Sequence, residues 1–266
     1  TMLPTVDVVT TDVHDPDQLA DVIRGADAVI NLVGVLHDAR GNAGFDGAHA
    51  ALARKVVAAC EAEGVPRLIH MSALNAATDG PSRYLQTKGE AEATIRASSL
   101  AWTILRPSVI FGAEDHFLNT FACLQRVAPV MMLAGADAKF QPVYVNDVAA
   151  AFVAALESED AVGRTYDLAG PRVYTLRELV KLAGRLSGHR RPVFGLPEGL
   201  GMLQAAMLEL SPVKLMSRDN VLSMKVDSVS DAEFPFGIVP QAIEAVAPSW
   251  FAGHDRYSDL RPRAGR

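Results

Sequence analysis

Tyr84 and Lys88 are the residues whose types and spacing point most directly to chemistry. Four residues apart on a helix, two side chains project from the same face. A nearby ammonium favours the tyrosinate form, so such a phenol can exchange a proton near neutral pH. The lysine can also hold a ribose hydroxyl. On an exposed helix the same pair is ordinarily two surface residues, so the surrounding elements decide between these interpretations.

Ser72 supports the chemical interpretation. It follows the apolar run 68–71, a predicted strand, and a parallel sheet presents functional residues where its strands end. Its hydroxyl is suited to hydrogen-bond a substrate carbonyl or alcohol. Ser72, Tyr84 and Lys88 are therefore the candidate catalytic residues. We expect these residues to contact a cofactor. Whether they also catalyse a reaction is left open.

Asp12 and Gly34 are candidate cofactor contacts. Asp12 lies between the predicted strand 6–10 and the predicted helix 15–25, where its carboxylate can accept from an adenine amino group or simply close a turn. Gly34 ends the continuous apolar run 28–33, predicted to be a strand buried on both faces. Without a side chain there, a ribose or nicotinamide can approach closely.

The glycines of the 41–47 segment have the spacing of a phosphate-binding loop but the wrong context. Such a loop must follow its strand directly, so that backbone N–H groups and a helix N-terminus meet the phosphates. Here six residues intervene after Gly34. We interpret 41–47 as a flexible surface loop.

Composition excludes several classes of protein. The chain has 266 residues, 49% of them hydrophobic, and a net charge of −6, which does not fit a nucleic-acid-binding protein. No apolar run approaches the roughly 18 residues that span a bilayer, and no leader pattern opens the chain. Seven histidines and two cysteines show neither metal-site spacing nor a disulfide framework, so we expect no metal and a reducing, cytoplasmic setting. Cys60 is predicted to be a core residue rather than a nucleophile.

Strand and helix patterns alternate at short intervals up to residue 112, which predicts a parallel sheet with helices on both faces. The pattern then loosens, so we expect residues 1–112 to form the core of the sheet domain, continued by elements within 140–170. Residues 113–266 are then mainly a small C-terminal α/β lobe for substrate or partner. The predicted strands are 6–10, 28–33, 68–71, 102–105, 142–145 and 165–168; the predicted helices are 15–25, 48–63, 83–97, 115–127, 147–156, 175–186 and 199–210.

An apolar stripe in the C-terminal lobe has two interpretations. Leu203, Met207 and Leu210, continued by Leu215 and Met216, recur at helical spacing. We favour helical core. A surface for a partner, lipid or hydrophobic ligand is the alternative. The last eleven residues, with four arginines, are expected to fray.

Several segments together resemble the extended, partly atypical short-chain dehydrogenase/reductase superfamily, which includes the NAD-dependent epimerase/dehydratase-like proteins. Within it the chain is similar to the branch of the NADPH-binding accessory subunit of respiratory complex I and its bacterial relatives. The matching stretches are 25–34, 70–74, 84–90, 105–112, 141–148 and 169–176.

The resemblance implies a Rossmann-type domain that binds NAD(H) or NADP(H), and it favours NADP(H). It implies that Tyr84 is an acid/base, that Lys88 lowers the tyrosine pKa and binds ribose, and that Ser72 positions the reacting oxygen. It also implies that the cofactor is contacted by residues after three strands: Asp12, Val13, Leu32, Val33, Gly34, Lys88, Pro107, Ser108, Val109 and Ile110.

The chain departs from the superfamily pattern in two ways. Only eleven residues separate Ser72 from Tyr84, which shortens the loop that shapes a sugar pocket and disfavours a nucleotide-sugar substrate. The segment 3–9 matches the approach to the superfamily's third strand. We therefore expect the first strand, Gly-rich loop, helix and second strand to lie outside this sequence.

Two functions from different classes follow. One is an NAD(P)-dependent oxidoreductase or epimerase-like enzyme that transfers hydride with Tyr84, Lys88 and Ser72. The other is a non-catalytic NAD(P)H-binding scaffold, or an assembly or accessory protein, of a respiratory or membrane-associated complex, peripheral to the inner membrane. The expected partners are a dinucleotide cofactor and either a small-molecule substrate or a protein or membrane partner, with no nucleic acid.

Overall fold

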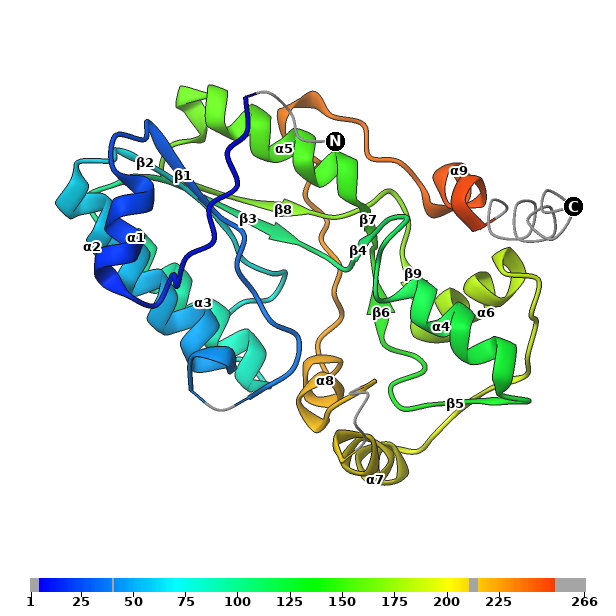
Figure 1. Ribbon diagram of the computed structural model, residues 1–266. Helices are drawn as coiled ribbons and strands as arrows, with labels where there is room; N and C mark the ends of the chain where they lie inside the picture. Colours follow the sequence, from blue (N-terminus) through cyan, green and yellow to red (C-terminus); the bar gives the residue numbers. More distant parts are fainter. Residues whose placement is uncertain (1–4, 40, 211–214, 252–266) are drawn as a thin grey trace, which may run out of the picture.

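A four-stranded parallel sheet forms the centre of the computed structural model, which describes residues 5–39, 41–210 and 215–251 (Figure 1). Its strand order is β1-β2-β3-β8, with β1 at Ala28–Asn31, β2 at Arg67–Met71, β3 at Ala101–Pro107 and β8 at Arg164–Leu168. Every neighbouring pair is parallel, so the strands end at the same edge. This sheet confirms the predicted fold class.

Helices cover the two faces of this sheet. On one side lie α1 (Pro16–Ile23), α2 (Leu52–Glu63) and α3 (Arg83–Arg96), and on the other lies α5 (Val145–Glu157) (Figure 1). Successive side chains of a strand point to opposite faces of the sheet, so each strand contributes to the core on both sides. Leu68 and Ile104 join the core against the first three helices, whereas Ile69 and Leu105 join the core against α5.

A second group of elements follows β3. It includes α4 (Leu118–Val127) and α6 (Leu176–Leu186), which pack around a core containing Leu118, Leu176 and Leu179. The short strands pair as β4 (Ile110–Phe111) with β7 (Val143–Tyr144), β5 (Met131–Leu133) with β10 (Val193–Gly195), and β6 (Lys139–Phe140) with β9 (Tyr174–Thr175). The remaining helices are α7 (Glu198–Glu209), α8 (Arg218–Ser223) and α9 (Ile243–Val246). The domain division at residue 112 stays a prediction.

Local signals set several helix starts where the sequence predicts them. Asp15 caps α1 through its carboxylate, which accepts from the backbone N–H groups of Asp17 and Gln18. Thr175 and Glu178 form the expected reciprocal capping box at the start of α6. Among the described residues, none of the helices combines the length and apolarity needed to cross a membrane.

Of the two strands predicted near the N-terminus, one does not form and the other is shorter than predicted. Residues 6–10 form no strand, and Val8 and Val9 are exposed. Propensity alone does not make a strand, since its backbone groups need a hydrogen-bonded neighbour. The run 28–33 is a strand only over 28–31, and it lies at the edge of the sheet rather than buried on both faces. Leu32 and Val33 accordingly keep 55% and 40% exposure.

The segment 41–47 is more ordered than predicted. A 3-10 turn at Gly41–Ala43 runs into a π-helical stretch at Asp46–Ala51, which continues directly into α2. A Cβ on Gly47 would lie 2.5 Å from Asn42 Cα, and one on Gly44 would lie 2.1 Å from Ala39 O. These glycines permit close backbone packing, so the glycine spacing needs no phosphate to explain it.

The favoured interpretation of the apolar stripe is also wrong. Leu203, Met207 and Leu210 are 58%, 66% and 88% exposed, and Leu215 is exposed as well. Met216 alone packs against a small buried cluster. Helical spacing identifies a common face of α7, but it does not show which side of the helix the fold covers. Cys60, in contrast, is fully buried as predicted.

Candidate functional site

Lys88 lies at the centre of the candidate site. It projects from α3 toward the end of β2, where its Nζ donates to the Met71 carbonyl oxygen at 3.0 Å. The side chain is 4% exposed, and burial lowers its pKa to about 8. A Cβ on Gly34 would lie 3.2 Å from this Nζ. The helix, the end of β2 and the segment after β1 therefore meet at one ammonium.

His49 joins this group, although the sequence analysis did not single it out. It lies in the π-helical turn before α2, where Nε2 accepts from Val35 N at 3.1 Å and Nδ1 is 2.9 Å from Thr87 Oγ1. Accepting at Nε2 places the imidazole hydrogen on Nδ1. Burial, followed by the charge of Lys88, lowers the His49 pKa to about 3, so the ring is neutral at physiological pH.

Tyr84 is held by aromatic packing and by its backbone. Its ring meets the His49 ring edge-on at 5.5 Å and the Phe45 ring at 5.8 Å. Asp219 of α8 accepts from the backbone N–H groups of Arg83 and Tyr84, which fixes the first turn of α3. Burial raises the Tyr84 pKa to about 12. That direction is opposite to the shift expected from a neighbouring ammonium.

Ser72 and His70 contribute unsatisfied polar atoms at the end of β2. They lie two residues apart on the strand, so their side chains share one face, and both residues are almost fully buried. Ser72 Oγ and both ring nitrogens of His70 have no hydrogen-bond partner among the described residues. Burial, and then the charges of Lys88 and His49, lower the His70 pKa to about 3. Buried polar atoms without partners are uncommon and call for an explanation.

The side chains of the predicted cofactor contacts after β3 are used mainly in packing and hydrogen bonds within the protein. Pro107 ends β3, and its carbonyl oxygen accepts from Leu74 N beside the Ser72 segment. Ser108 is buried and its hydroxyl is already engaged by the carbonyl and hydroxyl of Ser228. Val109 and Ile110 pack against two different hydrophobic clusters. This segment therefore borders the site through its backbone.

The predicted adenine contact, Asp12, and the other predicted cofactor contacts Val13, Leu32 and Val33 form none of the hydrogen bonds that connect Lys88, His49 and Thr87. Asp12 is exposed, and its Oδ1 accepts from His14 N at 2.9 Å, which is the turn-closing role that the sequence left open. Val13 packs against the hydrophobic cluster under α1 and α2. Leu32 and Val33 lie between β1 and Gly34 and remain exposed.

A buried ion pair anchors α3 below the site. Glu92, fully buried, accepts from Arg106 Nε at 2.7 Å and from Arg106 Nη2 at 2.6 Å. Arg96 adds a further bond at 2.8 Å. The side-by-side geometry with Arg106 is the strong, orienting form of a carboxylate–guanidinium pair. It ties α3, which carries Tyr84 and Lys88, to β3.

The residues at this edge fit the ribose and nicotinamide end of a dinucleotide. Gly34 leaves space beside Lys88, whose ammonium has two further donors besides the one given to Met71. Ser72 follows Met71 directly, and its Oγ has no hydrogen-bond partner among the described residues. Lys88 would hold a ribose hydroxyl, and Ser72 would face the reacting group. Bound there, NAD(P)H would supply a hydride.

Comparisons with known proteins identify the family to which the chain belongs. The family model described as NAD(P)H-binding matches residues 2–159, more than half of the chain. The mitochondrial NADH dehydrogenase [ubiquinone] 1 alpha subcomplex subunit 9 of Arabidopsis thaliana is 38% identical over 174 residues, which is 64% of this chain and 43% of that protein. The subunit of the same name in Mus musculus is 31% identical over 252 residues, which is 92% of this chain and 67% of that protein.

Among solved structures, an NADPH-dependent quinone oxidoreductase from Escherichia coli, complexed with NADPH, has the same fold. It aligns with a TM-score of 0.70 and 20% identity over 89% of this chain and 81% of that one. The chain spans less than half of the length of the plant relative, so these matches concern the part that they cover. They confirm the resemblance predicted from the sequence, and this chain belongs to the NAD(P)H-binding family.

Proposed function

We propose that the chain is the cofactor-binding part of an NAD(P)H-dependent reductase in which Tyr84 acts as the proton donor. The observation that supports this most is the meeting of Lys88, Gly34 and the Met71–Ser72 turn at one edge of the sheet. Tyr84 lies one helical turn before Lys88 on the same helix. In the proposal, Lys88 and Ser72 hold the cofactor and the substrate oxygen.

In the proposal Tyr84 acts as an acid, which requires a protonated phenol. With its pKa raised to about 12, the phenol is protonated at neutral pH and carries a proton for a developing alkoxide on the substrate. With NAD(P)H bound at this edge as the hydride donor, Tyr84 would give its phenolic proton to the carbonyl oxygen of the substrate, and the tyrosinate would regain a proton from solvent. Ser72 hydrogen-bonds the same oxygen through its hydroxyl.

A non-catalytic role is the second candidate. The relatives are named as subunits of NADH dehydrogenase, and the raised Tyr84 pKa makes this phenol a poorer acid than a free tyrosine. In that case the bound dinucleotide would stabilise a subunit at a respiratory, membrane-associated complex, on its peripheral side. Lys88 would still hold the cofactor, but Tyr84 would serve only as part of the aromatic packing.

Two measurements on the full-length protein separate these candidates. NADPH and NADH are titrated by fluorescence, and their oxidation is followed with quinones and aldehydes as acceptors. We expect Lys88→Gln to weaken cofactor binding by about tenfold or more, since it removes a charged donor. We expect Tyr84→Phe to bind cofactor normally and to lose about 10²-fold or more in turnover.

Tyr166→Phe is the matched control, because Tyr166 packs on the α5 side of the sheet. Normal cofactor binding without turnover in the unaltered protein supports the scaffold. Unchanged turnover in Tyr84→Phe ends the proton-donor role. Unchanged cofactor affinity in Lys88→Gln contradicts the placement of the cofactor itself.

A further inference from the structure

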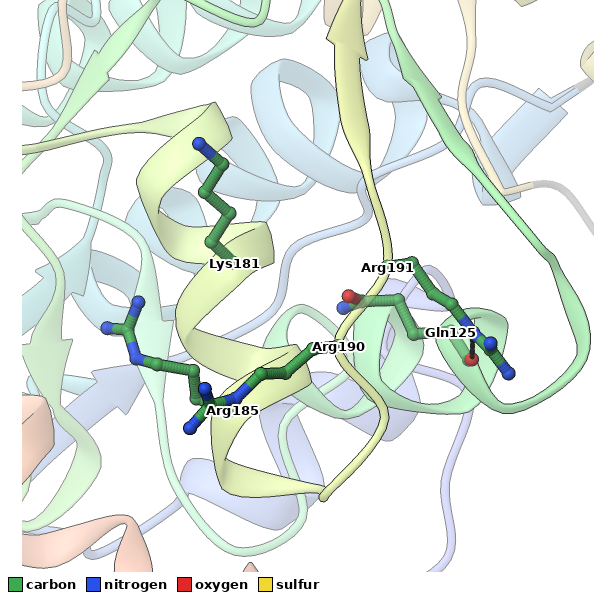
Figure 2. Close-up of a pocket in the computed structure, with 5 residues that line it drawn as sticks. All are labelled: Gln125, Lys181, Arg185, Arg190 and Arg191. Carbon is green, nitrogen blue, oxygen red and sulfur yellow. Dashed lines mark hydrogen bonds between the residues drawn. The ribbon is translucent and has the colours of Figure 1, made fainter.

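A basic hollow lies on the group of elements that follows β3, and it shares no residue with the site at α3. Five residues line it: Gln125 of α4, Lys181 and Arg185 of α6, and Arg190 and Arg191 of the segment leading to β10 (Figure 2). Its volume is about 240 Å³. Pockets for drug-sized ligands span roughly 300–1,000 Å³, so this hollow suits a smaller group.

The four cations of the hollow form no ion pair with a carboxylate among the described residues. On α6 itself, Arg177 pairs with Asp137 at 3.2 Å. Further along the same helix, Lys181 and Arg185 have no carboxylate within 4.0 Å among the described residues, and neither do Arg190 and Arg191. The whole chain carries a net charge of −6, so this concentration of unpaired positive charge is a local feature.

One carboxylate of the same helix, that of Glu178, interacts with Lys181 but is held by other hydrogen bonds. Glu178 lies one turn before Lys181, but its carboxylate accepts from the backbone N and hydroxyl of Thr175 in the capping box of α6. Lys181 and Arg185 are four residues apart, where like charges repel and weaken a helix. An anion bound between these side chains would turn that repulsion into attraction.

Gln125 gives the hollow a buried polar wall. Its Nε2 donates to Val180 O at 2.9 Å and to Phe121 O at 3.2 Å, which fixes the orientation of the amide. Its Oε1 is buried against Gly184 of α6, where a Cβ would collide with it, and it has no hydrogen-bond partner among the described residues. Figure 2 shows the amide pointing toward α6, between that helix and the Arg190–Arg191 segment.

The charge and size of the hollow say which ligand it suits. The surrounding cations select an anion, and guanidinium forks match the oxygens of phosphate especially well. A phosphate group therefore fits the hollow both in charge and in size.

We propose that this basic hollow binds the phosphate group of a phosphate-bearing ligand. Arg185 and Arg190 make the main ionic contacts, Lys181 adds charge, and Arg191, whose Nε donates to the Gln125 carbonyl oxygen at 2.9 Å, adds charge from the wall of the hollow. Two sources carry this chemistry: a soluble phosphate compound and the headgroup of an anionic phospholipid.

The test uses two double variants of the full chain that change charge equally. Arg185→Gln with Arg190→Gln alters the hollow. Arg172→Gln with Arg218→Gln alters two arginines that pair elsewhere, with Glu244 and Glu209. Inorganic pyrophosphate and glycerol 3-phosphate are titrated by calorimetry, and flotation is measured with phosphatidylcholine vesicles with and without phosphatidic acid. Circular dichroism verifies that each variant is folded.

We expect the hollow variant to bind its ligand about tenfold or more weaker than the unaltered chain, and the control to bind normally. Binding of the soluble phosphates alone identifies a soluble ligand, and binding of the phosphatidic acid vesicles alone identifies a lipid headgroup. Equal losses in both double variants would show a general charge effect and overturn the proposal. Absence of binding to every probe would overturn it too. Neither result bears on cofactor binding at Lys88.

Discussion

His49 Nδ1 lies 2.9 Å from Thr87 Oγ1, and both side chains are fully buried. Because Nε2 accepts from Val35 N, the imidazole donates to Thr87, whose hydroxyl in turn donates to the carbonyl oxygen of Arg83 or Tyr84. One line of hydrogen bonds therefore links the segment after β1 to the turn of α3 that carries the candidate residues.

Replacing Thr87 by Val tests this link, since valine keeps the shape and removes the hydroxyl. We expect a loss of about 1–3 kcal/mol in the free energy of unfolding, because the His49 N–H is left buried without an acceptor. Thr94→Val is the matched control, as Thr94 makes only a backbone bond to Glu90 on the same helix. Urea unfolding measures both, and equal stabilities would contradict the link.

The two buried histidines predict acid sensitivity. Their pKa values of about 3 lie below the usual value of about 6.5, so the unfolded chain binds more protons between these limits. Stability therefore falls as the pH drops through 6.5, by about 2 kcal/mol per histidine between about pH 7 and pH 5. Urea midpoints across this range measure the effect. In His70→Leu about half of this dependence should disappear, and an unchanged slope would refute the assignment.

Removing the charge of Glu92 should strongly lower the free energy of unfolding. Glu92→Gln leaves Arg106 and Arg96 without their shared carboxylate, which we expect to cost about 3–5 kcal/mol in unfolding free energy. Glu90 is partly exposed and pairs with Arg83 at the surface. Glu90→Gln breaks only this pair, so it should lower the free energy of unfolding by about 1 kcal/mol or less. Chemical denaturation measures the unfolding free energy of both variants. Similar losses in the two would contradict the role of the Glu92–Arg106 pair in anchoring α3.

The close backbone packing around Gly47 should make any side chain at this position destabilising. A methyl group there would meet Asn42 Cα at 2.5 Å and Gly41 O at 2.6 Å, so Gly47→Ala should destabilise the fold by about 1–3 kcal/mol. Gly199 of α7 has open space around it, and Gly199→Ala should be neutral or stabilising by up to about 1 kcal/mol. Thermal unfolding compares the two. A harmless Gly47→Ala would favour a loosely packed loop instead.

Local patterns were sufficient to predict most of the alternating elements between residues 15 and 112, although not the strand expected at 6–10, and they singled out Ser72, Tyr84 and Lys88 as candidates. Caps such as Asp15 and Thr175 act within one helical turn, so their effect is readable from neighbouring residues. The order of strands and helices also limits a parallel sheet to a few arrangements, which places the ends of β2 and β3 at one edge.

Only the tertiary structure decided which faces are covered and which charges are buried. The exposed stripe of α7 and the edge position of β1 depend on what packs against them, and periodicity carries no such information. His49 lies 38 residues from Thr87 in the chain, so their hydrogen bond is invisible to any local pattern. Burial also reversed the expected direction of the Tyr84 pKa, because removing water from a phenol penalises its charged form.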